Sequence, residues 1–233
     1  MRKLLFGRSP KQTSYGDPAK NTGSAEFEVN NWVISQFIVD TLVPVVGVHP
    51  FPLDELMLMT GAVCRVKPRL IFEWGTNIGK SARIFYEVTK SFGISSEIHS
   101  IDLPDDVFHG EHPGNERGKM VRGLKEVTLH QADGLTRSFE ILEQKGNPEQ
   151  VLFFVDGDHS FESVSRELSA ILTRCPGAAV LLHDTFNQSE DSGYNTGPFR
   201  AVNQVLEKFP GKYKTVSTRL GLPGMTLVFK ERH

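Results

Sequence analysis

Short apolar runs alternate with amphipathic stretches from residue 69 onward. Five of these runs are continuous and rich in branched apolar side chains, as expected for strands whose two faces are both buried. The strand-like runs cover residues 69–74, 97–102, 127–133, 151–156 and 178–184. Helical spacing of apolar residues appears in 79–92, 136–145, 161–173 and 198–209. This alternation predicts a doubly wound α/β fold around a mostly parallel sheet.

Both ends of the chain depart from this alternation. Two more strand-like runs, 213–218 and 225–230, flank a turn rich in glycine and proline, which predicts a terminal hairpin. Residues 7–30 are mainly small and polar, which predicts a loose segment or an arm beside the substrate site. Helical spacing then covers 32–48 and 53–66. We therefore expect a partly flexible arm and helix over 1–52 and one domain over 53–233.

Charge and length narrow the class of protein. The 233 residues carry a formal net charge of -2 with both signs interspersed, so a dedicated nucleic-acid-binding surface is not expected. The most apolar stretch, 32–48, is interrupted by polar residues and proline, so it predicts a core or homodimer-interface helix and not a membrane span. Two cysteines, Cys64 and Cys175, are too few for a disulfide framework, which favours a reducing, cytoplasmic location.

An acidic residue stands at or near the end of each of the five central strands. Ligands of an open parallel sheet bind beyond the carboxyl ends of its strands, so these positions define a candidate site. A single aspartate there is about as often a turn former or a helix cap, whereas an acid at every strand end favours a ligand. The five acids are Glu73, Asp102, Asp133, Asp156 and Asp184.

A glycine turn follows the first central strand. Glu73, Gly75 and Gly79 form the pattern E-x-G-x-x-x-G, which differs from the G-x-G-x-x-G of dinucleotide-binding proteins. A pyrophosphate needs bare backbone amides, whereas an amino-acid carboxylate with a sulfonium needs an anion site and a nearby acid, which Glu73 supplies. Ser81 lies in the first turn of the next helix. A plain glycine turn without a ligand is the alternative interpretation.

Two further acids suit a nucleoside. Asp102 ends the second strand, where a carboxylate accepts hydrogen bonds from both ribose hydroxyls. NAD-binding proteins use an acid in the same role, so Asp102 indicates a nucleoside cofactor without showing which one. Asp133 follows the third strand and either meets an adenine amino group or caps the helix that begins near Thr136.

The last two strand ends carry the candidate chemistry. Asp156, Asp158, His183 and Asp184 are expected to converge on one divalent cation, and their oxygen-rich set suits magnesium or manganese. His159 lies close to them and is a candidate general base. The alternative is that Asp158 and His159 only cap the next helix. Two more histidines, His109 and His112, lie in a loop that we expect to overhang the pocket, as solvated or substrate-gating residues.

These segments together resemble class I methyltransferases that depend on S-adenosylmethionine. The likeness is to the branch that groups cephalosporin hydroxylase-like proteins with small O-methyltransferases of sugars and macrolides. It extends from Leu53 to the C-terminus, and its most specific parts are D-G-D-H-S-F-E-x-V-x-x-E-L at Asp156–Leu168 and C-P-G-A-A-V-L-L-H-D-T at Cys175–Thr185. Ala178 replaces the second glycine of the family's P-G-G, and Gly197–Val202 resembles the helix before the final hairpin.

The resemblance implies a sheet of six parallel strands and one antiparallel strand. It also implies S-adenosylmethionine as methyl donor and, in metal-dependent relatives, magnesium. The implied cofactor residues are Glu73, Gly75, Thr76, Asn77, Gly79, Ser81, Asp102, Leu103, Asp133, Gly134 and Asp156. The implied metal ligands are Asp156, His183 and Asp184, and the catalytic candidates are His159 and Asp156. Metal-dependent members usually carry an acid where this chain has His183, so a metal-free site with His183 or His159 as base stays open.

We therefore expect methyl transfer to a hydroxyl of a small molecule such as a sugar, a polyketide or another secondary metabolite. Two other interpretations stay open, an NAD-dependent oxidoreductase and a non-catalytic protein that binds a nucleoside on the same fold. The missing G-x-G-x-x-G argues against the first, and the D-x-x-H segment argues against the second. The acceptor is expected to be selected by residues 1–52, 104–120 and 186–197.

Overall fold

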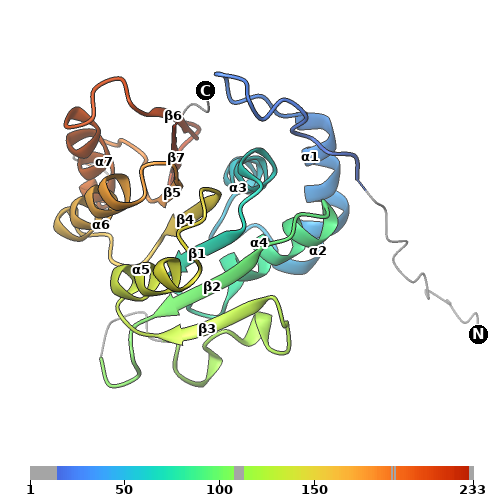
Figure 1. Ribbon diagram of the computed structural model, residues 1–233, viewed down its shortest axis with the longest axis horizontal. Helices are drawn as coiled ribbons and strands as arrows, with labels where there is room; N and C mark the ends of the chain where they lie inside the picture. Colours follow the sequence, from blue (N-terminus) through green and yellow to red (C-terminus); the bar gives the residue numbers. More distant parts are fainter. Residues whose placement is uncertain (1–14, 108–112, 190, 192, 231–233) are drawn as a thin grey trace, which may run out of the picture.

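The chain folds around one seven-stranded sheet with the strand order β3-β2-β1-β4-β5-β7-β6 (Figure 1). The computed structural model describes residues 15–107, 113–189, 191 and 193–230. The strands are β1 (Leu70–Trp74), β2 (Glu97–Asp102), β3 (Val127–Gln131), β4 (Val151–Val155), β5 (Ala179–His183), β6 (Lys214–Ser217) and β7 (Met225–Phe229). Only β7 runs antiparallel to its neighbours, β5 and β6. The doubly wound, mostly parallel sheet and its terminal hairpin are therefore confirmed.

Helices cover both faces of the sheet, as the continuous apolar strands predict. One face packs against α1 (Asn31–Phe37), the π-helical η1 (Ile38–Leu42), α2 (Val43–Val46), α3 (Leu53–Val66) and α4 (Lys80–Ser91). The other packs against α5 (Gly134–Gln144), α6 (Phe161–Arg174) and α7 (Gly197–Glu207). Neighbouring residues of a strand enter opposite cores: Phe153 packs with the second group of helices and Phe154 with the first. The two short 3₁₀ turns η2 (Gly114–Glu116) and η3 (Lys119–Val121) lie between β2 and β3.

The order of the strands places a crevice at the centre of the sheet. From β1 the chain moves outward through β2 to β3, and it then returns to place β4 on the other side of β1. The loops after β1 and β4 therefore leave the sheet in opposite directions, and a ligand can enter between them. This topology puts four of the five acids identified at strand ends, Asp102, Asp133, Asp156 and Asp184, around a single opening.

The described part of the N-terminal segment lies at the other end of the molecule. Residues 15–30 contain neither helix nor strand, yet Ala19 is fully buried. The Arg65 guanidinium, at the end of α3, donates to the carbonyls of Thr22 and Ser24. Because α3 ends just before β1 begins, this contact lies at the amino edge of the sheet. An arm beside the substrate site is thus not found in residues 15–30, because the guanidinium anchors them elsewhere.

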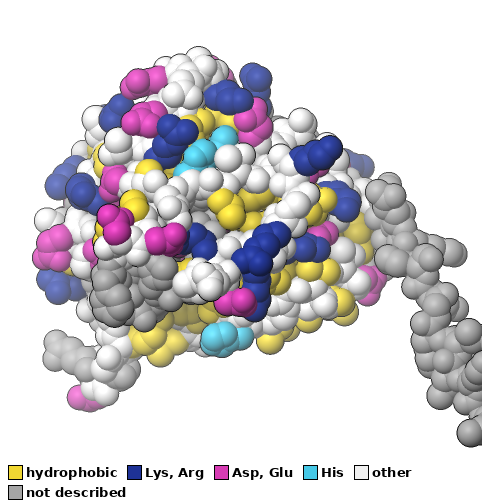
Figure 2. All heavy atoms as spheres, turned by 90° about the horizontal axis from the view of Figure 1, so that it is seen from below, with side chains coloured by type: hydrophobic (Ala, Val, Ile, Leu, Met, Phe, Trp, Pro, Cys, Tyr) yellow, Lys and Arg dark blue, Asp and Glu magenta, His cyan; other side chains and the backbone are white. Residues whose placement is uncertain are grey.

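The apolar stretch 32–48 forms α1, η1 and α2, and its buried side chains belong to the core. Trp32 and Val39 remain 87% and 65% exposed on its outer side. Within the described ranges, no helix combines the length and the apolar content that crossing a bilayer requires. Basic and acidic side chains are interspersed on the face seen in Figure 2, in keeping with the charge pattern of the sequence.

Candidate active site

The carboxyl ends of β1 to β5 open into one cavity of about 1100 Å³. Its wall contains most of the residues that the sequence indicated. These are Gly75, Thr76, Asn77, Ser81, Asp102, Leu103, Asp133, Gly134, Asp156, His159, His183 and Asp184. Glu73 and Gly79 lie outside the wall that the described residues form. Four of the five strand-end acids therefore line the cavity, whereas Glu73 does not.

Gly75 brings the loops after β1 and β4 into contact. Its φ is +94°, and a Cβ atom there would lie 2.3 Å from the carbonyl oxygen of Asp156. Only glycine combines that backbone angle with that separation. Gly79 begins α4 at a φ of +84° and packs against Gly118 and Val121 instead of the cavity. The glycine turn thus shapes the opening through Gly75 and holds a neighbouring loop through Gly79.

Glu73 is fully buried beneath this turn. Ser100 donates a hydrogen bond to its Oε1, and the Ser100 hydroxyl also lies 2.7 Å from Oγ1 of Thr76. Burial raises the pKa of Glu73 to about 8, despite the hydroxyl donors. At neutral pH this side chain is therefore mostly uncharged. Glu73 supports the turn from below. The sequence suggested that its carboxylate supplies a negative charge to the ligand, and this buried, mostly uncharged side chain does not fit that role.

Asp102 is held by an arginine that the sequence did not indicate. Its Oδ1 accepts the backbone N–H of Leu103 at 3.0 Å, and its Oδ2 accepts Nε of Arg117 at 3.2 Å. Arg117 also donates to the carboxylate of Asp105 and, at 3.0 Å, to the carbonyl of Leu103. The arginine therefore fixes the Asp102 carboxylate at the wall of the cavity, where it can accept hydroxyl groups of a ribose.

Trp74 and the start of α5 form the next part of the wall. Asp133 caps α5 by accepting the backbone N–H of Thr136 at 2.8 Å, so the capping role considered from the sequence is confirmed. A Cβ atom at Gly134 would lie 2.6 Å from the indole of Trp74, which explains the glycine by protein packing. The indole Nε1 donates to Ser138 at 2.9 Å. Trp74 thus presents a fixed aromatic surface beside Asp133, suited to a flat base.

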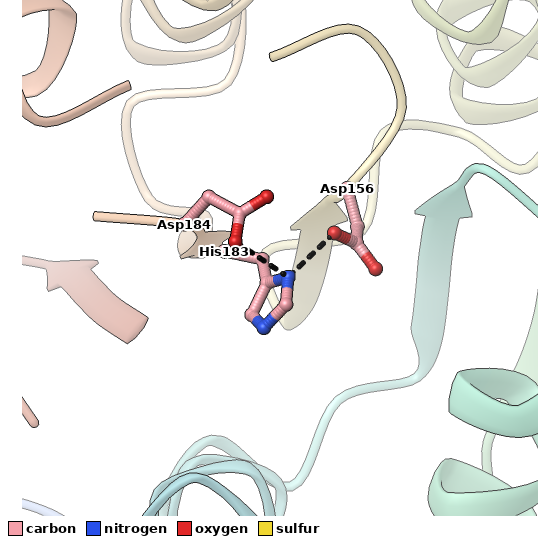
Figure 3. A group of neighbouring side chains, drawn as sticks. All are labelled: Asp156, His183 and Asp184. Carbon is pink, nitrogen blue, oxygen red and sulfur yellow. Dashed lines mark hydrogen bonds and ion pairs between the residues drawn. The ribbon is translucent and has the colours of Figure 1, made fainter. Parts of the chain in front are cut away.

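The side chains after β4 and β5 converge (Figure 3). Asp156 Oδ1 lies 2.8 Å from Nδ1 of His183, and Asp184 Oδ1 lies 3.7 Å from the same nitrogen. One ligand atom from each of these three residues falls within 4.8 Å of the others. The predicted convergence of the last two strand ends is therefore observed. Asp184 adopts a φ of +55°, a backbone angle that is uncommon for a residue other than glycine.

His159 joins the same cluster from the loop before α6. Its Nδ1 lies 2.6 Å from Oδ2 of Asp184, and its Nε2 lies 3.5 Å from Oδ1 of Asp156. Tyr194 donates its hydroxyl proton to Oδ1 of Asp184. Asp158, in contrast, accepts from Ser160 and Ser163 at the start of α6. The capping alternative is thus correct for Asp158, whereas His159 points to the carboxylates.

The carboxylates and imidazoles shift one another's pKa. The neighbouring Asp156 and Asp184 raise the pKa of His159 to about 10. Burial lowers the pKa of His183, but Asp156 and Glu55 outweigh it and raise the value to about 11. For Asp184, burial opposes ionisation, yet the two histidines hold its pKa below the usual value. Pairing therefore keeps the cluster charged in the absence of other ions.

Four residues of this site were not indicated by the sequence. Glu55 reaches His183 from α3, Tyr194 reaches Asp184 from the loop after β5, and Arg117 and Trp74 hold the nucleoside side. Trp74 could have been found, because it is the last residue of a strand that ends at the site. The other three carry no motif. His109 and His112 lie outside the described residues.

The comparisons with known proteins agree with this geometry. Residues 72–185 match the family model described as a methyltransferase domain. A Klebsiella pneumoniae protein, provisionally assigned as an O-methyltransferase, shares 17% identity over 87% of this chain and 97% of its own, with a TM-score of 0.53. The Bacillus cereus O-methyltransferase in complex with SAH shares 13% over 84% and 90%, with a TM-score of 0.51.

The O-methyltransferase TomG from Streptomyces achromogenes, solved with SAM, is 17% identical over 84% of this chain and 87% of its own, with a TM-score of 0.50. A search of curated proteins finds no match. At such identities the solved structures establish a shared fold, while the domain model covers the segment that supplies most of the cavity wall. Residues 72–185 of the chain therefore match a methyltransferase domain, and the chain shares the fold of solved O-methyltransferases.

Proposed function

We propose that this methyltransferase transfers the methyl group of S-adenosylmethionine to a hydroxyl group of a small molecule, such as a sugar, a polyketide or another secondary metabolite. The observation that carries the proposal is the His159–Asp184 pair beside the cavity. Nδ1 of His159 is held at 2.6 Å from Asp184, while Nε2 makes no hydrogen bond among the described residues. An imidazole held between two carboxylates, with Nε2 buried 3.5 Å from Asp156, suits removal of a hydroxyl proton at the cavity wall.

The residues of the other half of the cavity fit the donor. Asp102, fixed by Arg117, suits the ribose hydroxyls, and Trp74 with Asp133 suits the adenine. The glycine turn at Gly75 leaves room beside Thr76 and Asn77 for the amino-acid part. Two structures of the same fold are named as O-methyltransferases in complex with SAH or SAM, which supports this assignment.

The bound donor supplies a methyl group that is activated by a positively charged sulfur. The protein then has two tasks, to align an acceptor oxygen with that methyl group and to remove the proton of the hydroxyl. His159 takes the proton, and Asp184 holds the ring and stabilises the imidazolium that forms. Asp156, 3.5 Å from Nε2, holds the opposite edge of the ring.

The protonation state of His159 adds a condition. Because Asp156 and Asp184 raise its pKa to about 10, the imidazole is protonated at neutral pH until a further positive charge arrives. A sulfonium bound in the same cavity repels the imidazolium and lowers this pKa. We therefore expect donor binding to lower this pKa, so that His159 loses its proton at a lower pH than in the free protein.

The two competing interpretations receive no support from the site. The match to a methyltransferase domain leaves the NAD-dependent oxidoreductase without a supporting observation. A non-catalytic nucleoside-binding protein would have no need of a base with an orienting carboxylate. Three further expectations stay predictions: a cytoplasmic location, no nucleic-acid partner, and a homodimer that covers the exposed Trp32 and Val39.

Transfer of a tritiated methyl group from S-adenosylmethionine to a panel of sugars, macrolides, polyketides and phenols tests the proposal. We expect a labelled ether product with at least one hydroxyl acceptor and loss of that product in His159→Gln. Labelled products that form only with amine or thiol acceptors would contradict the assignment to O-methyl transfer.

A further inference from the structure

His183 lies between two carboxylates that come from distant parts of the chain. Its Nδ1 is 2.8 Å from Oδ1 of Asp156, and its Nε2 is 3.0 Å from Oε2 of Glu55. Glu55 belongs to the first turn of α3, outside the matched segment 72–185, and is only 1% exposed. Both ring nitrogens of His183 therefore face acids, the buried Glu55 and the partly exposed Asp156.

This arrangement bears on the expected magnesium site. An imidazole can ligate a metal only through a nitrogen that carries no proton and has its lone pair free. If Glu55 is ionised, both nitrogens of His183 carry protons and donate to the two acids. If Glu55 is protonated, it donates to Nε2, while Nδ1 still donates to Asp156. In neither arrangement does His183 offer a lone pair to an ion.

The remaining candidate ligand is also engaged. Asp184 faces Nδ1 of His159 with Oδ2 and accepts the hydroxyl of Tyr194 with Oδ1. Magnesium prefers six oxygen ligands in an octahedral arrangement, and Asp156 and Asp184 are the acids that face one another here. To bind there, the ion would have to displace two imidazoles that already balance the charge of these acids. The donor set therefore does not fit magnesium.

We propose that Glu55 and His183 form a buried clamp that takes the structural place of a divalent cation, so that this methyltransferase works without one. Glu55 holds His183, His183 holds Asp156, and Asp156 together with Asp184 keeps His159 in place. Glu55 is thus a positioning residue, contributed by a helix that lies outside the matched domain. The inference rests on the proposed function, because it describes how the same site holds its base.

Manganese binding tests the absence of a metal without any activity measurement. Mn²⁺ is added to the wild-type protein, and free Mn²⁺ is followed by electron paramagnetic resonance. We expect the spectrum of the free ion to keep its full intensity at millimolar Mn²⁺. Binding of one Mn²⁺ per chain that is lost in His183→Ala would overturn the proposal. This outcome is separate from the proposed function, which fails instead if S-adenosylhomocysteine does not bind.

Two substitutions test the role of Glu55. Glu55→Gln keeps an oxygen that can accept from Nε2 of His183, whereas Glu55→Leu removes it. We expect Glu55→Leu to lower kcat by about 10- to 100-fold with unchanged affinity for S-adenosylhomocysteine, as displacement of a base predicts. Glu55→Gln is expected to stay within about threefold of the wild type, since only the net charge changes.

Full kcat in a folded Glu55→Leu, or an equal loss in both variants, would overturn the positioning role. Thermal unfolding of each variant shows whether the fold is retained. The manganese titration uses the wild-type protein, so it decides the metal claim even where Glu55→Leu does not fold.

Discussion

Nδ1 of His159 lies 2.6 Å from Oδ2 of Asp184, and the opposite nitrogen of the ring has no hydrogen-bond partner among the described residues. An imidazole held on one side by a carboxylate has a fixed orientation and tautomer, so its other nitrogen is directed to one place. Here that nitrogen is buried and lies 3.5 Å from Oδ1 of Asp156, so the ring is held between two carboxylates at the wall of the cavity. The fold brings the ends of β4 and β5 together, and this places His159 and Asp184 in the contact on which the proposed proton transfer depends.

Replacing His159 tests this relationship. His159→Gln removes the base, and we expect methyl transfer to fall by about 100- to 10,000-fold while S-adenosylhomocysteine binds as in the wild type. In the wild type the rate should rise between about pH 7 and pH 9, because His159 loses its proton in this direction, and the variant should lose this dependence.

His130→Gln is the matched control, since His130 pairs with His99 away from the cavity. It is expected to leave the pH profile unchanged. A His159→Gln protein with wild-type kcat would show that another group removes the proton.

The donor side is tested at Asp102. Asp102→Asn keeps the shape of the side chain but removes the charge that Arg117 and the ribose hydroxyls share. We expect affinity for S-adenosylhomocysteine to fall about 10- to 100-fold, the effect of losing one or two charge-assisted hydrogen bonds, as measured by calorimetry. Asp105→Asn is the control, because Asp105 also pairs with Arg117 but does not line the cavity. An equal loss of affinity in both variants would show that the substitutions act by releasing Arg117 and not by removing a contact with the ligand.

The turn after β1 predicts a steric effect. Gly75→Ala would put a Cβ atom 2.3 Å from the carbonyl of Asp156 at a φ of +94°. We expect a loss of stability well above the roughly 1–2 kcal/mol that the left-handed backbone alone costs, together with loss of ligand binding. Gly93→Ala isolates the backbone cost, because Gly93 has a φ of +65° with nothing within 4 Å. Urea unfolding of both variants compares them, and equal destabilisation would rule out the clash.

Glu73 predicts a dependence of stability on pH. Its pKa rises from 4.5 to about 8 on folding, so the folded protein holds a proton that the unfolded chain releases. The free energy of unfolding should therefore fall as the pH rises from about 4.5 to about 8, by at most roughly 1.4 kcal/mol per pH unit. Glu73→Gln should lose this part of the dependence in urea unfolding at several pH values. The exposed Glu126→Gln is the control, and a Glu73→Gln protein that follows the wild-type curve would contradict the buried neutral acid.

Much of the fold could be predicted from the sequence, because the strands are buried on both faces and read as continuous apolar runs. The run 97–102 is β2 without change, and 151–156 extends β4 by one residue. The site positions of Asp102, Asp156 and Asp184 could be predicted too, because the carboxyl ends of parallel strands lie at one edge of the sheet. The strand pattern did not show that Glu73 lies beneath the turn, although a position inside a strand directs the side chain to a face of the sheet.

The contacts of Glu55 and Tyr194 could not be predicted in the same way. Glu55 is 128 positions from His183 in the sequence, and nothing in α3 shows that its first turn lies over the end of β5. Tyr194 follows β5 in a loop whose path depends on tertiary packing. Both residues complete the site through long-range packing, which a motif of adjacent residues does not record.

Calorimetric titration of the wild-type protein with S-adenosylhomocysteine tests the central claim most directly. We expect binding at one site per chain, with affinity that weakens in Asp102→Asn and persists in His159→Gln. Absence of binding at millimolar S-adenosylhomocysteine in the folded protein would contradict the assignment of the cavity to the methyl donor.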